Sequence, residues 1–291
     1  MKNWIIRILT ASILIICTAC AQQENHPNIV ATTMPVYTFT QALCDKTPIH
    51  VTQLVQENVS CLHDYTLTVR HMKLLESADL LVVSGGGLES FLDDMLLKQK
   101  TVIDAAEQIK FHHAEDLHTH EHDHHHEVDP HYWLSIESAK QMALTICQGL
   151  INAYPEHSDT FNQNMAKLNA VFADLENYAQ EQLSHLKHRE IITFHDGFSY
   201  MAEAFDLVIL KAIEEESGSE ASAQELVEIC QLVSSRRIPA IFIEKNGSSG
   251  AASVISRETG ANVYTLDMAI SGSNYFDAMY YNIDTLKEAL E

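Results

Sequence analysis

Short apolar segments alternate with amphipathic segments along most of the chain. The first run of this alternation predicts strands at 28–33, 49–55, 79–87 and 101–105 and helices at 36–44, 69–78 and 88–98. A second run predicts strands at 190–194, 207–213, 239–244 and 262–267 and helices at 199–205, 222–236, 250–260 and 275–290. Strands that alternate with helices in this way favour mostly parallel sheets with helices on both faces.

Two helical patterns separate these runs. The first covers residues 135–154, and the second covers residues 158–188 without a glycine or a proline. Apolar positions in the second pattern recur too irregularly for coiled-coil heptads, so we interpret it as a strut between domains. We therefore expect an α/β fold of two lobes, each with a mostly parallel sheet flanked by helices, joined by one long rigid helix. The N-terminal lobe would cover 20–157 and the C-terminal lobe 189–291.

The N-terminus has the composition of a processing segment. Two basic residues in "MKNWIIR" are followed by the apolar run 8–18, which is short for a bilayer span and typical of a signal peptide. A small residue before Cys20 resembles a bacterial lipobox, although Cys17 stands where leucine is usual. We expect removal of residues 1–19 and lipidation of Cys20. A C-x-x-C metal or redox motif is the alternative for the same four letters.

The chain is strongly acidic, with a formal net charge of −22. Removal of residues 1–19 takes away two positive charges and no acid, which leaves −24. This charge disfavours nucleic acid as a partner and is compatible with cations, although acidic surfaces commonly serve solubility alone. Export permits disulfides, and whether Cys44 pairs with Cys61 is left open.

Histidine is concentrated in one polar segment, residues 108–130, which interrupts the first alternation. Of the 17 histidines in the chain, eight fall in this segment as His112, His113, His118, His120, His122, His124, His125 and His126. The segment has no hydrophobic period, so we expect a mobile surface loop. Imidazole is the commonest metal ligand, and the tract predicts weak secondary metal binding, with a solvated loop of no role as the alternative.

A tighter site is predicted by position in the fold. Ligands bind at the carboxyl ends of strands in open parallel sheets. His63 follows the strand 49–55, His195 and Asp267 each follow or end a strand of the second lobe, and His131 lies in a loop before a helix. Each could singly be a hydrogen-bonded loop residue or a helix cap. As a set they predict a metal held between two lobes.

Several longer motifs resemble one known family. They are "LHDYTLTVRHMKLLESADLLVVSGGGLESFL", "DPHYWLSIESAKQMA", "FHDGFSYMAEAFDL", "EASAQELVEICQLV" and "IFIEKNGSSGAASVISRETGANVYTLD". In this order and spacing they resemble the metal-specific substrate-binding lipoproteins of bacterial ABC importers, the cluster A-I type that handles zinc and manganese. The resemblance covers nearly the whole mature chain. It departs from the family at "VQENVSCLH", which lacks the usual glycine and proline, and at Asp196, where proline is usual.

The resemblance implies a metal-binding role for His63, His131, His195 and Asp267. Zinc-handling members often carry a His-rich loop ahead of the "DPH-x-W" motif, as this chain does. Three imidazoles and one carboxylate suit tetrahedral Zn²⁺, whereas Mn²⁺ prefers more oxygen ligands, and manganese members usually place a carboxylate where His195 stands. Asp267 or a water molecule would be the fourth ligand.

The function that this implies is zinc capture outside the cytoplasmic membrane and delivery to an ABC permease and its ATPase. We expect a monomer, lipid-anchored to a bacterial membrane, with no nucleic-acid partner; which membrane is left open. Manganese delivery and surface adhesion are the alternatives within the family. An enzyme is not expected, because the chain has neither H-E-x-x-H nor G-x-S-x-G, and "SGGGLES" does not match G-x-G-x-x-G.

Overall fold

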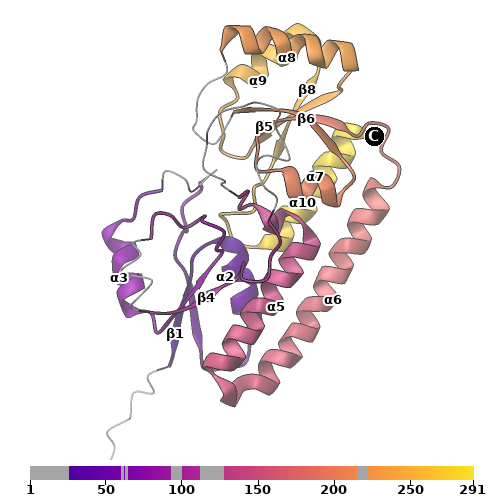
Figure 1. Cartoon of the computed structure of the whole chain (residues 1–291). Coiled ribbons are helices and arrows are strands. Elements are labelled where there is room, and N and C mark those ends of the chain that lie inside the picture. The colour runs from indigo at the N-terminus through magenta and orange to yellow at the C-terminus, as the bar shows by residue number, and fades with distance from the viewer. Residues whose placement is uncertain (1–25, 60–61, 63–64, 93–99, 112–127, 215–221) are drawn as a thin grey trace, which may run out of the picture.

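A computed structural model describes residues 26–59, 62, 65–92, 100–111, 128–214 and 222–291. These residues form two sheets, one in each half of the chain, with helices packed around them (Figure 1). Within these ranges no helix combines the length and the apolar character that crossing a membrane requires. The predicted signal peptide, Cys20, Cys61, His63 and the histidines of 112–126 lie outside the described residues.

The first sheet is entirely parallel, as the alternation of strands and helices predicts. Its strands, in the order β2-β1-β3-β4, are β1 Asn28–Ala31, β2 His50–Gln53, β3 Leu80–Val83 and β4 Thr101–Asp104. The helices among the described residues of this half are α2 Met34–Leu43, α3 Val69–Ser77, α5 Ile136–Ala153 and the short 3₁₀ helix η2 Tyr132–Leu134. Strand β3 is buried along its whole length, which explains why its sequence is a continuous apolar run.

The second sheet repeats the arrangement in the order β6-β5-β7-β8. Its strands are β5 Glu190–His195, β6 Val208–Glu214, β7 Ala240–Glu244 and β8 Asn262–Leu266. The helices of this half are α7 Ser199–Ala204, α8 Ala223–Arg236, α9 Gly250–Thr259 and α10 Tyr275–Leu290. Local sequence fixes several ends: Ser222 and Glu225 form a capping box at the start of α8, and Gly260 ends α9 with φ 80°.

The predicted strut is helix α6, Ser158–Leu183, which follows the short η3 Pro155–His157 and runs beside both halves (Figure 1). It ends five residues before the predicted boundary at residue 188. The backbone N–H groups of Lys187 and His188 both donate to the carbonyl of Leu290, at 3.0 and 3.1 Å, so pairing with the end of α10 replaces the last helical turn.

The chain crosses between the two halves a second time through residues 267–275. The indole N–H of Trp133 donates to the carbonyl of Met268 at 2.9 Å, and the amide of Met34 donates to the carbonyl of Ile270 at 3.0 Å. The hydroxyl of Tyr275 donates to the carbonyl of Trp133 at 2.7 Å. Helix α10 packs against α6 and α2, so the last helix shares its core with the first half.

The glycine cluster after β3 forms a turn, and the predicted helix at 88–98 is wrong over its described part. Residues 88–92 are turns, and residues 93–99 lie outside the described chain. The buried carboxylate of Glu89 accepts the N–H groups of Ser84 at 2.6 Å and Gly85 at 3.0 Å, and the Thr32 hydroxyl at 2.6 Å. The backbone N–H groups of Ser84 and Gly85 therefore donate to Glu89 and not to an external anion. Three consecutive glycines with positive φ make this tight turn possible.

Candidate metal centre

His131 is a fully buried histidine with a fixed orientation. Its Nδ1 lies 2.8 Å from Oδ1 of Asp129, and its backbone N–H donates to the same oxygen at 2.9 Å. The other oxygen of Asp129 accepts the hydroxyl of Ser199, at the start of α7. Burial alone would raise the pKa of Asp129, but these hydrogen bonds and the His131 charge hold that pKa below its usual value. A carboxylate on Nδ1 makes Nε2 the atom through which His131 would bind a metal.

His195 is the last residue of β5 and brings a second imidazole to the same place. The two rings are perpendicular, with centroids 5.1 Å apart, although one residue comes from each half of the chain. His195 is 6% exposed. Gly197 makes the close approach possible, because a Cβ at this position would lie 2.7 Å from Nδ1 of His131.

Glu244 is a functional candidate that the sequence analysis missed. It is the last residue of β7, the strand that pairs with β5, and its Oε2 lies 3.7 Å from Nδ1 of His195. Asp196 lies at 4.0 Å from the same nitrogen. The arrangement resembles that of Asp129 and His131, since both rings have carboxylates on the Nδ1 side. The strand-end rule that selected His195 would have found Glu244 in "IFIE" as well.

Asp267 follows β8 directly, as predicted, but other groups occupy its carboxylate. Its Oδ2 accepts from the Lys245 ammonium at 2.9 Å, and its Oδ1 accepts from the Ala269 N–H at 2.9 Å. The Asn282 side chain accepts the backbone N–H of Asp267 and donates to the backbone carbonyl of Asp267, at 2.7 Å each. The hydrogen bond and charge of Asp267 raise the pKa of Lys245, so this ammonium stays charged. To bind a metal, Asp267 would have to exchange Lys245 for the ion.

The structure describes the loop that precedes His63 as far as Val59. Val59 and Asn58 line a small cavity of about 40 Å³ together with Lys245, Asn246, Asp267, Met268, Ser271 and Gly272. The loop that carries His63 therefore reaches the segment around Asp267. Among the residues that the structure describes, no group of three or more His, Cys, Asp or Glu side chains is close enough to hold a metal. The described part of the candidate centre is the His131–His195 pair with its carboxylates.

The fold and this pair can now be compared with known proteins. Residues 29–289 match the family described as ZnuA, the periplasmic component A of zinc-uptake complexes. The chain belongs to the ZnuA family. The family consists of extracytoplasmic metal-binding proteins of ABC uptake systems, which bind their cargo and do not catalyse a reaction.

Individual relatives of this ZnuA-family chain are distant but cover most of it. A putative metal-binding protein of Treponema pallidum is 26% identical over 96% of this chain and 94% of its own length. Zinc-binding lipoprotein AdcA of Streptococcus pneumoniae is 28% identical over 97% of this chain, which spans only 60% of AdcA. The solved structure of ZnuA superposes with a TM-score of 0.80 at 24% identity, covering 92% of this chain and all of that one. The periplasmic zinc-binding protein TroA of T. pallidum superposes with a TM-score of 0.78 at 21% identity, covering 91% of this chain and 99% of TroA. These superpositions show the same fold.

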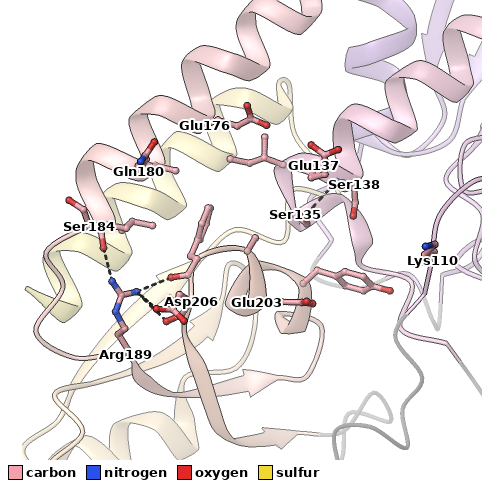
Figure 2. Close-up of a pocket in the computed structure, with 16 residues that line it drawn as sticks. Lys110, Ser135, Glu137, Ser138, Glu176, Gln180, Ser184, Arg189, Glu203 and Asp206 are labelled. Atoms are coloured by element: carbon pink, nitrogen blue, oxygen red, sulfur yellow. Dashed lines mark hydrogen bonds and ion pairs between the residues drawn. The ribbon is translucent and has the colours of Figure 1, made fainter.

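A larger cavity of this ZnuA-family chain lies apart from the two histidines. It has a volume of about 700 Å³ and lies between α5, α6 and the first residues of the second half, including α7 (Figure 2). Arg189 crosses one end of it and donates to the carbonyls of Leu183, Phe205 and Asp206 at 3.1–3.2 Å. Its donors thus join α6 to the second half. The three predicted ligands that the structure describes, His131, His195 and Asp267, do not line this cavity.

Proposed function

We propose that the protein captures Zn²⁺ outside the cytoplasmic membrane, between its two lobes, and delivers the ion to an ABC permease and its ATPase. In this proposal His63, His131 and His195 supply three imidazole nitrogens, and Asp267 or a water molecule completes a tetrahedral shell. The site binds and releases its cargo, and no catalytic step is required.

The pairing of His131 with His195 carries this proposal. Zinc lies about 2.0–2.1 Å from an imidazole nitrogen, which puts each ring centroid about 3.2 Å from the ion. Two such rings at the tetrahedral angle have centroids about 5.2 Å apart. The observed separation of 5.1 Å supports a shared ion without a large movement of either ring. The carboxylates on the Nδ1 sides orient both rings so that Nε2 is the atom available to a metal.

Zinc is favoured over manganese by the donor set. Imidazole nitrogens in a small tetrahedral shell suit Zn²⁺, whereas Mn²⁺ is bound more weakly and prefers oxygen ligands. The name of the AdcA relative, a zinc-binding lipoprotein, also supports zinc. A protein of the same fold, FpvC of Pseudomonas aeruginosa, is described in complex with Mn²⁺ and with Ni²⁺, so manganese delivery is the alternative to be tested.

Anchoring and the His-rich tract complete the proposal. Lipidated Cys20 would tether a monomeric mature chain to the outer side of a bacterial membrane, and the lipoprotein AdcA supports this expectation. The histidines of 112–126 would bind further zinc weakly, because ordering a segment without a scaffold costs entropy.

The decisive experiment is metal analysis of the mature protein purified without a tag, followed by chelator competition with Zn²⁺ and Mn²⁺. We expect one tightly bound Zn²⁺ and a preference for zinc. His195→Ala should weaken binding by more than the 10–100-fold that changes behind metal ligands cause. The exposed His185 provides a matched control, His185→Ala, which should bind like the parent protein. A His195→Ala protein that titrates like the parent would show that the site is misassigned.

Surface adhesion is a second candidate, because a protein of similar fold is described as a laminin-binding adhesin with metal-transporting activity. That protein, Lmb of Streptococcus agalactiae, superposes with a TM-score of 0.77 at 23% identity and covers 91% of this chain and 100% of Lmb. Growth of a deletion strain in zinc-limited medium separates the candidates, since only a delivery protein restores growth through its His195 side chain.

A further inference from the structure

The loop between β2 and α3 carries His63, yet residues 54–68 contain no glycine and no proline. Proline fixes φ and so reduces the freedom of a loop, and this loop lacks that restraint. A metal ligand on a loop must be held close to its bound position if binding is not to cost ordering entropy. Side chains can supply such a restraint instead, and the described residues on both sides of His63 contain a set that joins them.

Three side chains meet across the loop. The hydroxyl of Tyr65 donates to Oε2 of Glu57 at 2.7 Å, and Nε2 of His71 lies 3.2 Å from Oε1 of the same carboxylate. The Tyr65 hydroxyl lies 3.3 Å from the same His71 nitrogen. Glu57 precedes His63, while Tyr65 and His71 follow it. We call Glu57, Tyr65 and His71 the loop clamp, because it joins the two arms of the loop.

His71 contributes through both of its ring nitrogens. It is fully buried at the third position of α3, where its Nδ1 accepts the backbone N–H of Thr68 at 3.1 Å as part of a capping box. Because Nδ1 accepts this bond, the proton of the neutral ring belongs on Nε2, which faces Glu57. One side of the ring thus caps the helix, and the other side holds the opposite arm of the loop.

The charges of the clamp match these roles. The hydrogen bond from Tyr65 lowers the pKa of Glu57, so the acceptor is a carboxylate at neutral pH. The Tyr65 phenol is the donor in this hydrogen bond, because a carboxylate can only accept. Arg70 adds a positive charge 3.9 Å from Glu57. The Tyr65 ring also packs edge-on against Phe91, with centroids 5.1 Å apart.

The arm that precedes His63 is also attached to the crossing segment 267–275, which begins with Asp267. The N–H of Val59 donates to the hydroxyl of Ser271 at 3.2 Å, and that hydroxyl donates to the carbonyl of Val59 at 3.1 Å. Ser271 follows Asp267 by four residues. The clamp therefore connects α3 to an arm that already contacts the second lobe.

We propose that Glu57, Tyr65 and His71 are positioning residues for metal binding, which hold the two arms of the loop together and preorganise the segment that carries His63. This inference rests on the proposed function, in which His63 is a ligand. It assigns a role to the loop that contains "VQENVSCLH", where the usual glycine and proline of the family are missing.

The test is a double-mutant cycle read out by zinc affinity in chelator competition. Tyr65→Phe removes only the hydroxyl that joins the clamp, and we expect it to weaken zinc binding about tenfold, at the lower end of the range for groups behind metal ligands. His71→Asn keeps an acceptor for the Thr68 amide but is too short to reach Glu57, and we expect the same loss. His71→Gln, which reaches Glu57, should recover most of the affinity.

Two controls make the result specific. Tyr178→Phe removes a bond of the same kind, from Tyr178 to Asp284 at 2.6 Å between α6 and α10, and should leave zinc affinity unchanged. In a His63→Ala background, Tyr65→Phe should cost less than twofold, because the clamp acts through that ligand. Thermal unfolding of the apo proteins checks that each variant is folded.

The outcomes separate the two proposals. If His63→Ala itself binds zinc like the parent, the ligand assignment is wrong and the clamp proposal is overturned with it. If His63→Ala loses affinity but Tyr65→Phe does not, only the clamp is overturned. An equal loss from Tyr65→Phe in both backgrounds would also overturn it, because that result describes general destabilisation.

Discussion

Gly197 offers a sharp test of whether the His131–His195 pair is the centre. A Cβ placed on Gly197 would lie 2.7 Å from Nδ1 of His131 and 2.8 Å from two carbons of the ring, whereas ordinary contacts begin near 3.4 Å. Gly197→Ala therefore requires a displacement of about 0.7 Å, by either the ring or the backbone. The ring cannot move freely, because it is fully buried and hydrogen-bonded to Asp129. The backbone cannot move without His195, which is two residues away.

The expected magnitude follows from the cost of overpacking. Inserting one carbon into a packed interior costs about 1–3 kcal/mol. If the apo protein relieves the contact by displacing a ring, zinc binding must restore the original geometry and meet this cost. At 1.4 kcal/mol per tenfold, the dissociation constant for Zn²⁺ should rise by about 5- to 140-fold. Gly197→Ala would thus weaken zinc binding without removing any ligand.

The assay is chelator competition at fixed pH, with thermal unfolding of the apo protein measured in parallel. Gly250→Ala is a matched control in the same lobe, since the nearest side-chain atom to a Cβ there is 3.8 Å away. We expect Gly250→Ala to bind zinc like the parent. A Gly197→Ala protein that binds zinc within twofold of the parent would refute the reasoning. Such a result would mean that zinc binding does not depend on the position of the His131 ring.

Two further predictions concern groups around the centre. Deletion of residues 112–126 should remove the weakly bound zinc from a calorimetric titration and leave the one tightly bound ion, because these histidines belong to a different segment of the sequence from His131 and His195. Loss of the tightly bound ion on deletion would show that the tract is part of the main site. Lys245→Met removes the cation that Asp267 now binds. The Lys245 side chain is 59% exposed, and an ion pair screened by solvent on one side is worth up to about 1 kcal/mol, so zinc affinity should rise by up to about fivefold if Asp267 is the fourth ligand. An unchanged affinity would favour water in that position.

The elements of the fold could be predicted because each strand and helix has a strong local signal. Buried parallel strands such as β3 are continuous apolar runs, and α8 has a capping box in its sequence. The end of α6 could not be predicted, since it depends on carbonyl pairing with Leu290, far along the chain. The 88–92 turn was mistaken for a helix because the hydrophobic period continues past glycines whose positive φ values only the structure shows.

The positions of the candidate site residues could be predicted to the level of strand ends and no further. The rule that ligands lie at the carboxyl ends of strands selected His195 and would equally have selected Glu244, which lies beside it. Side-chain partners follow no such rule. Nothing in the sequence indicates that Lys245 binds Asp267, or that Gly197 is required by the ring of His131. The status of His63, His131, His195 and Asp267 as metal ligands remains a prediction, and His63 in addition lies outside the described residues.

The connections between the lobes bear on how zinc would be released. Helix α6 has no glycine or proline at which to kink, and the crossing at 267–275 is held to the first half through Trp133 and Met34. The lobes also meet at Asp129, which accepts hydrogen bonds from Ser199 and Tyr200 of α7. A wide hinge opening would exchange these hydrogen bonds for bonds to water, at a net cost of about 0.5–1.5 kcal/mol each.

We therefore expect zinc to be released by loosening a ligand-bearing segment, and zinc binding to cause only small local changes. Small-angle scattering of the apo and zinc-bound mature protein should give radii of gyration that differ by less than about 0.5 Å, on a value of about 18–19 Å for a compact chain of this length. Hydrogen exchange should nevertheless show protection gained at residues 128–134 and 193–198, where the two imidazoles are held. A clear compaction on adding one equivalent of zinc would mean that α6 and the second crossing bend together, and release by local loosening would then have to be abandoned in favour of a hinge.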